Sequence, residues 1–148
     1  MQPHLKNDLL YLLRILEAAE KIMLYATPFE DAQDFFAAKD QMAFNACLNL
    51  PGQIGEQSNK SSKTLTEKYP EPDWNLIRGM RNRIVHDYSG IDLYVAFDNI
   101  KKQIPALKIS ISGIVKRELT AGNFDKEEFT IAQTSPYLRH VDFDVIKD

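Results

Sequence analysis

Cysteine is nearly absent from this sequence of 148 residues, because Cys47 is the only one. A single thiol excludes an internal disulfide and a zinc site built from several cysteines. The neighbours of Cys47 in the sequence are apolar, which predicts a small buried hydrophobic side chain rather than a nucleophile.

Long hydrophobic runs are also missing. No apolar stretch approaches the roughly 20 residues that a helix needs to cross a bilayer, so we expect no membrane span. The N-terminal stretch MQPHLKNDLL lacks the basic start and the long apolar run of a signal peptide. Together these two absences favour a cytoplasmic protein.

There is little excess of either charge, since the formal net charge is -3. An overall basic field that attracts nucleic acid is therefore excluded, and any site for a polyanion must be local. Hydrophobic residues make up 44% and charged residues 26%, which is typical of a soluble globular protein. The length suits one domain with a real core.

Helical periodicity is what the sequence has in abundance. Apolar residues recur at steps of three and four from His4 to Thr27, which predicts a first helix that ends ahead of a proline. A short second helix is expected at Asp31–Ala38, and a long third helix at Asp40–Glu67. A proline within residues 48–52 predicts a kink or a broken turn in this third helix.

Two further helices are expected in the second half of the chain. Asp73 is a good N-cap for a helix that opens with Trp74, which we interpret as a core anchor, and Ser89-Gly90 ends this helix. The next helix begins after Asp92, and Pro105 should bend or restart it. These elements predict an all-α fold.

The expected architecture is an up-and-down bundle of four to five helices within residues 1–119. Residues 120–148 mix Phe, Thr, Tyr, Val and Ile with acids and show no clean helical period. We expect this C-terminal extension to be extended or to form short strands, packed on the bundle or on a partner chain.

Chemically active side chains are concentrated in Arg78–Asp92, which reads RGMRNRIVHDYSGID. Arginine can hold a phosphate through two parallel hydrogen bonds while negative charge builds. Histidine exchanges protons near neutral pH and can take one from the 2'-hydroxyl that RNA has and DNA lacks. His86 is the only histidine in this stretch, and His4 and His140 lie far away without ligand spacing, so we expect no metal site and no cofactor.

A plainer interpretation is open at this point. On a straight helix Arg81 and His86 stand about 140° apart, so they converge only if the last turn tightens. A helix with these residues is usually a solvated face. Arg83 and Asp87 would then form only a surface ion pair worth about 0.3–0.5 kcal/mol.

The order of motifs along the chain narrows this choice. Residues 81–88 read RNRIVHDY, an Arg-x4-His-x-Tyr motif. Ile54-Gly55-Glu56 stands in the long third helix, and Tyr69-Pro70 with Asp73-Trp74 precedes the motif helix. This series resembles the HepT-like toxins, a branch of the HEPN superfamily, over roughly Leu5 to Ile111.

The resemblance implies a helical bundle that forms a homodimer, with the motifs of two chains facing one cleft. It also implies a metal-independent endoribonuclease that acts as a type II toxin on an RNA substrate. Arg81 would bind the scissile phosphate and stabilise its developing charge, and His86 would be the general acid/base. The supporting residues would be Asn82, which positions the RNA, Tyr88, which completes the site, and Arg78 and Arg83.

A nucleotidyltransferase antitoxin is the protein partner that the resemblance implies. In some members of the branch the antitoxin transfers AMP to the motif tyrosine, here Tyr88. A bulky anion on Tyr88 would occupy the cleft beside Arg81 and exclude an RNA phosphate. The alternative is a non-catalytic nucleotide-binding or adaptor module that serves a nucleotidyltransferase.

A second apolar strip is expected to favour self-association. Phe44, Leu48 or Tyr94 would stay on the surface after the long amphipathic helices bury one face each. Pro51-Gly52 departs from the branch, whose long helix is usually smoother at this point, and the extension beyond Leu119 has no recognised counterpart.

Overall fold

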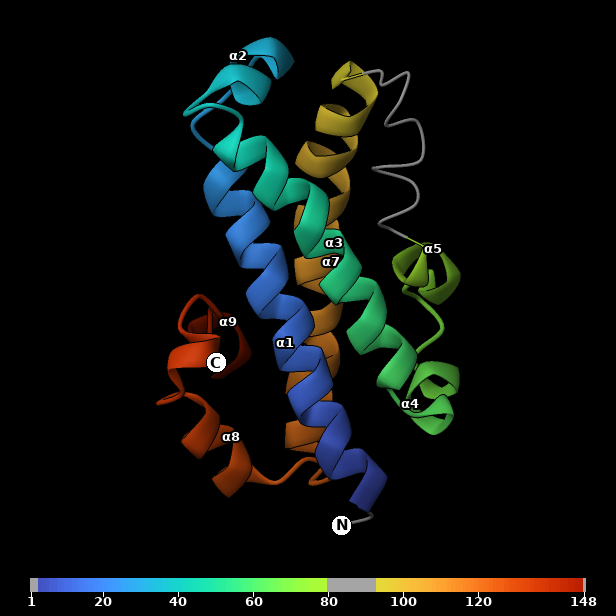
Figure 1. The fold of residues 1–148 in the computed structure, drawn as a ribbon. Coiled ribbons are helices and arrows are strands. Elements are labelled where there is room, and N and C mark those ends of the chain that lie inside the picture. Colours follow the sequence, from blue (N-terminus) through green and yellow to red (C-terminus); the bar gives the residue numbers. More distant parts are fainter. Residues whose placement is uncertain (1–2, 80–92, 148) are drawn as a thin grey trace.

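The computed structural model describes residues 3–79 and 93–147 (Figure 1). All regular secondary structure in these residues is helical, which confirms the all-α prediction. The long helices α1 (Pro3–Ala26), α3 (Met42–Lys60) and α7 (Leu93–Thr120) form the bundle, in which α1 runs antiparallel to the other two. Within the described ranges no helix is both long and apolar enough to cross a membrane.

Helix α1 lies at the centre of the bundle, because it packs against both α3 and α7. The side chains on its inner face follow steps of three and four and have no exposed surface: Leu12, Ile15, Ala19 and Ile22. At the C-terminal end of α1, Nζ of Lys101 donates a hydrogen bond to the carbonyl oxygen of Ala26 at 2.9 Å. The predicted first helix is therefore confirmed to within one residue at each end.

The short helix α2 (Ala32–Ala37) closes one end of the bundle (Figure 1). Its N-cap is Asp31, whose carboxylate accepts a hydrogen bond from the first turn. The buried ring of Phe35 lies 6.2 Å from the ring of Phe44 in α3 and 5.2 Å from that of Phe97 in α7, measured between centroids. The second predicted helix is confirmed.

Helix α3 continues through Pro51, so the predicted broken turn does not occur. Pro51 is itself buried, and Cys47 and Ile54 on either side of it are 0% exposed. Burial of this face against α1 offsets the loss of one backbone hydrogen bond at the proline.

The predicted Asp40–Glu67 helix breaks at Ser61–Ser62 instead, between α3 and the short helix α4 (Lys63–Lys68). The cause is Asp8 in α1, which is 1% exposed. Its carboxylate accepts hydrogen bonds from the backbone N–H of Ser62, at 2.7 Å, and from the Ser62 hydroxyl. The same hydroxyl oxygen caps α4, and such side-chain hydrogen bonds compete with continuation of a helix.

The described part of α7 starts at Leu93 and continues through Pro105 as one helix, and the predicted cap at Asp92 lies outside the described residues. The predicted restart at this proline is therefore wrong. Ile104 and Leu107 beside it are 0% and 6% exposed, so packing again holds the helix together across a missing hydrogen bond.

The C-terminal extension is helical, so the expectation of extended chain or strands in residues 120–148 is wrong where the structure describes them. It forms α8 (Lys126–Ala132), the 3-10 turn η2 (Pro136–Leu138) and α9 (Asp144–Lys147). Asp125 caps α8 by accepting a hydrogen bond from the backbone N–H of Glu127 at 2.8 Å. These helices are too short for a helical period to show in the sequence.

Ion pairs and apolar contacts hold the extension on the bundle. The Glu17 carboxylate lies 2.7 Å from Nδ1 of His140 and accepts a hydrogen bond from the His140 backbone N–H, also at 2.7 Å. Nζ of Lys108 in α7 lies 2.7 Å from Glu20 of α1 and 3.2 Å from Asp142. The buried apolar residues of the extension are Phe124, Phe129, Leu138, Val141 and Ile146. The division at residue 119 stays a prediction.

The buried thiol supplies the first testable prediction. Cys47 is 0% exposed, and burial raises its pKa to about 12. Because the thiolate is the reactive form, the native protein is expected to be inert to a thiol-specific reagent at pH 8. Labelling should appear only as denaturant unfolds the chain, in parallel with circular dichroism, and rapid labelling of the folded protein would contradict the buried position.

Candidate functional site

The motif residues Arg81, Asn82, Arg83, His86 and Tyr88 lie outside the described residues. Of the predicted site residues the structure therefore places Arg78, which is exposed at the end of the short helix α5 (Trp74–Arg78). The structure describes the elements that flank the motif in the sequence, α5 before it and α7 after it (Figure 1).

Helix α5 is fixed by a cap and two buried side chains. The Asp73 carboxylate accepts a hydrogen bond from the backbone N–H of Leu76 at 3.0 Å, which confirms the predicted N-cap. The Trp74 ring is buried, and its Nε1 donates a hydrogen bond to the carbonyl oxygen of Tyr69 at 2.8 Å. Ile77 is also buried, at 4% exposure, so α5 has a defined position on the bundle.

Helix α5 approaches the bundle closely at Gly55 of α3. A Cβ atom at this position would lie 2.7 Å from the carbonyl oxygen of Arg78, closer than real Cβ contacts allow. Ile54 before it is 0% exposed, and Glu56 after it faces solvent and pairs with Lys60 at 3.4 Å. The Ile-Gly-Glu step thus combines a core residue, a helix contact and a surface residue. The sequence pattern alone did not reveal that glycine touches α5.

The loop before α5 is tied to the end of α7 by Glu118, whose side chain is 1% exposed. Its carboxylate lies 2.8 Å from Nζ of Lys68 and accepts a hydrogen bond from Nδ2 of Asn123 at 2.6 Å. Burial alone would raise the pKa of Glu118, but hydrogen bonds from Lys68, Asn123 and Tyr69 lower it. Burial and the hydrogen bond to Glu118 raise the pKa of Tyr69 to about 12.

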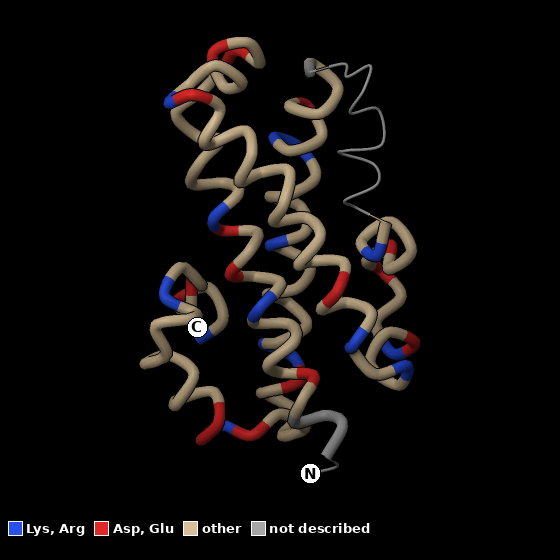
Figure 2. Tube along the Cα trace, viewed as in Figure 1, with Lys and Arg blue, Asp and Glu red and all other residues tan. Residues whose placement is uncertain are grey.

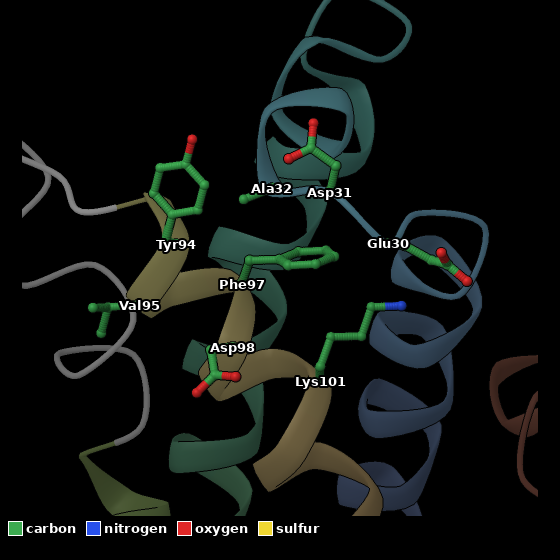
Figure 3. Close-up of a pocket in the computed structure, with 8 residues that line it drawn as sticks. All are labelled: Glu30, Asp31, Ala32, Tyr94, Val95, Phe97, Asp98 and Lys101. Atoms are coloured by element: carbon green, nitrogen blue, oxygen red, sulfur yellow. The ribbon is translucent and has the colours of Figure 1, made fainter.

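A hollow of about 740 Å³ lies at the N-terminal end of α7 (Figure 3). It is lined by Glu30, Asp31 and Ala32 from the α1–α2 connection and by Tyr94, Val95, Phe97, Asp98 and Lys101 from α7. The described residues of its lining carry three carboxylates and one ammonium group, and that ammonium group already donates a hydrogen bond to the end of α1. These described side chains give the lining an excess of negative charge, which does not favour phosphate.

The predicted second apolar strip is only partly present. Phe44 and Leu48 are 4% and 8% exposed, so they belong to the core and not to a surface. Tyr94 and Val95 in the first turn of α7 are 58% and 52% exposed. Phe44 was misassigned because α2 covers it with Phe35 and Phe36, a contact that the period of α3 does not show.

The described residues form an all-helical fold, in which the predicted site at residues 81–88 lies in sequence between the short helix α5 and the long helix α7. The family model "Ribonuclease HepT-like" matches residues 15–114, and the chain belongs to this family. By this resemblance the protein is an endoribonuclease.

Similar proteins carry ribonuclease names. The "Probable ribonuclease HepT" of Thermococcus cleftensis is 32% identical over 99 residues, which cover 66% of this chain and 86% of that protein. A protein of Methanocaldococcus jannaschii named "Putative RNase" is 29% identical over 106 residues, 72% of this chain and 85% of the relative. A third, of the same name, from Caldanaerobacter subterraneus is 29% identical over 110 residues, 73% and 94% of the two chains. No solved structure shows significant similarity.

A second prediction concerns the anchor of the loop before α5. Glu118→Gln is expected to lower the free energy of unfolding at pH 7 by about 1–3 kcal/mol, because a buried carboxylate loses charge-assisted hydrogen bonds. Since its folded pKa lies below the ordinary value of 4.5, this stability is present above about pH 4.5 and is lost as the pH falls through the folded pKa. Denaturant unfolding from pH 7 to pH 3 measures the difference.

The matched control is Glu67→Gln. Glu67 is 66% exposed and lies 3.8 Å from Lys63, so its loss is expected to change stability by less than about 0.5 kcal/mol at any pH. If Glu118→Gln and Glu67→Gln lower the free energy of unfolding equally, Glu118 holds the loop no more strongly than a surface ion pair would.

Proposed function

We propose that the chain is a metal-independent endoribonuclease toxin of a type II toxin-antitoxin pair. The observation that carries the proposal is the Arg-x4-His-x-Tyr motif at residues 81–88, which lies inside the part of the chain that matches the ribonuclease family. Arg81, His86 and Tyr88 are its central residues. The named relatives, which are ribonucleases by name, support the same substrate class.

The proposed reaction is transfer of the phosphodiester to the neighbouring 2'-oxygen. The 2'-oxygen forms a bond to phosphorus, the bond from phosphorus to the 5'-oxygen breaks, and a 2',3'-cyclic phosphate and a 5'-hydroxyl result. His86 takes the proton from the 2'-hydroxyl and delivers a proton to the leaving 5'-oxygen. Arg81 binds the phosphate and stabilises the charge that develops on its oxygens. Neither a metal ion nor a cofactor takes part in this scheme.

The remaining motif residues support binding. Asn82 positions the RNA, Tyr88 completes the site, and Arg78 and Arg83 add positive charge where phosphates pass. Arg78 is exposed at the end of α5, which suits this role. Figure 2 shows Lys and Arg interspersed with Asp and Glu along the described helices, so a local cluster of arginines has to supply the attraction.

The proposed assembly is a homodimer with two motifs at one cleft, located in the cytoplasm. A nucleotidyltransferase antitoxin is the proposed partner, and transfer of AMP to Tyr88 is the proposed means of inhibition. The bundle of residues 1–119 would carry the activity, and residues 120–148 would form a separate extension. A non-catalytic adaptor that binds a nucleotide is the alternative, and the cleavage experiment distinguishes the two.

The decisive variant is His86→Ala. Purified parent protein is expected to cleave total cellular RNA in the presence of EDTA and to leave cyclic or 3'-phosphate ends. The variant is expected to cleave at least about 100-fold more slowly, because general acid/base catalysis is lost. Gel analysis of the RNA and chemical analysis of the 3' ends measure both results.

The control is His4→Ala, which removes a histidine far from the motif in sequence and should cleave like the parent. Intact mass must show that Tyr88 carries no added group, and the protein must be made without its partner. If the parent and His86→Ala cleave equally, His86 is not the catalytic base. If neither cleaves, the adaptor is the better explanation.

The dimer has its own test. Tyr94 and Val95 are exposed apolar residues at the start of α7, close to the motif in sequence, and such surface favours self-association. Light scattering at micromolar concentration is expected to give a dimer for the parent and more monomer for Tyr94→Lys. Tyr137→Lys, at a residue 85% exposed on the extension, should stay dimeric. A monomeric parent would exclude the two-chain cleft.

A further inference from the structure

At Gly55 the backbone of α3 lies against the backbone of α5, the short helix that precedes the motif in the sequence. Its missing side chain leaves room for the carbonyl oxygen of Arg78, which would lie 2.7 Å from a Cβ atom, with the Ile77 carbonyl oxygen at 3.5 Å. Both obstacles are backbone atoms, so a rotamer change cannot relieve the clash. A methyl group at this position forces one helix to move.

Helix α5 is the one that has to move. Around Gly55, helix α3 is anchored in the core by Cys47, Ile54 and Ser58, all 0% exposed. Helix α5 has only five residues and holds on to the bundle through Trp74 and Ile77. The shorter and less buried element yields first when two packed helices are forced apart.

A displacement of α5 shifts the point from which the chain continues to the motif. Arg78 is the last residue of α5, and Arg81 follows three positions later in the sequence. Catalytic groups tolerate little displacement, since a misplacement of about 1 Å can reduce the rate about 100-fold. The contact at Gly55 therefore sets where the chain enters residues 81–88.

We propose that Gly55 is a positioning residue for the ribonuclease motif, acting through the backbone of Arg78. This inference rests on the proposed function, because it requires that residues 81–88 catalyse cleavage. Gly55 touches neither substrate nor reacting atoms. Its role is to keep the surface of α3 free of a side chain, so that α5 lies directly on it.

The test compares two glycine variants in long helices. In Gly55→Ala the new Cβ meets backbone, whereas in Gly113→Ala of α7 the nearest atom is the end of the Arg117 side chain at 4.0 Å. Sites that bind RNA are counted by titration with an oligonucleotide whose 2'-hydroxyls are methylated, so that it binds and cannot be cleaved. Rates are then expressed per binding-competent site.

The expected result is a fall of at least about tenfold in kcat for Gly55→Ala, with KM within about threefold of the parent, because phosphate binding tolerates a small shift and proton transfer does not. Gly113→Ala should match the parent in both. A purely structural role would lower the number of competent sites and leave kcat per site unchanged.

If Gly55→Ala yields no sites that bind RNA, two milder substitutions test the positioning role instead. Ile77→Val loosens the packing of α5 and keeps Gly55, and Ile22→Val makes the same change in α1, at a residue that is 0% exposed. A lower kcat per site for Ile77→Val alone supports positioning, and equal values overturn it.

The outcomes separate this inference from the proposed function. If Gly55→Ala cleaves RNA as fast per site as the parent, the protein is still a ribonuclease and the positioning role is overturned. A parent that does not cleave RNA overturns the proposed function, and the positioning role falls with it.

Discussion

Burial of α1 on two sides is the interaction on which the other elements depend. Its inner face packs against α3 and α7 at once, and Leu12, Ile15 and Ile22 have no exposed surface. A helix held in this way fixes the two long helices relative to each other, and the shorter elements attach to that frame. Polar side chains of α1 also fix neighbouring elements. Asp8 accepts hydrogen bonds just beyond the end of α3, and Glu17 accepts a hydrogen bond from the extension.

The fold could be predicted from the sequence wherever information was local. The period of α1 and the cap at Asp73 each depend on residues a few positions apart, and each was confirmed. The failures come from distant contacts. Pro51 stays helical because its face is buried. Helix α3 ends at Lys60, just before Ser62 donates hydrogen bonds to Asp8 of α1, a contact that no local pattern contains.

The candidate site was predictable as a motif but not as a geometry. Arg81, His86 and Tyr88 remain a prediction, which was made from their order and spacing along the chain. The role of Gly55 was hidden, because its contact is a backbone oxygen at Arg78 that belongs to another helix. The helical period of the sequence shows only that a small residue stands at this position. The packing of the two helices shows which backbone atoms occupy the space that a side chain would need.

The charges around the flanking helices restrict where RNA can pass in the proposed enzyme. Arg78 at the end of α5 is exposed and attracts phosphate, whereas Glu30, Asp31 and Asp98 around the hollow at the start of α7 repel it. In Figure 1 the extension lies beside α1, on the other side of the bundle from α5. In the proposed enzyme the exposed Arg78 would therefore attract RNA on the α5 side, away from the extension.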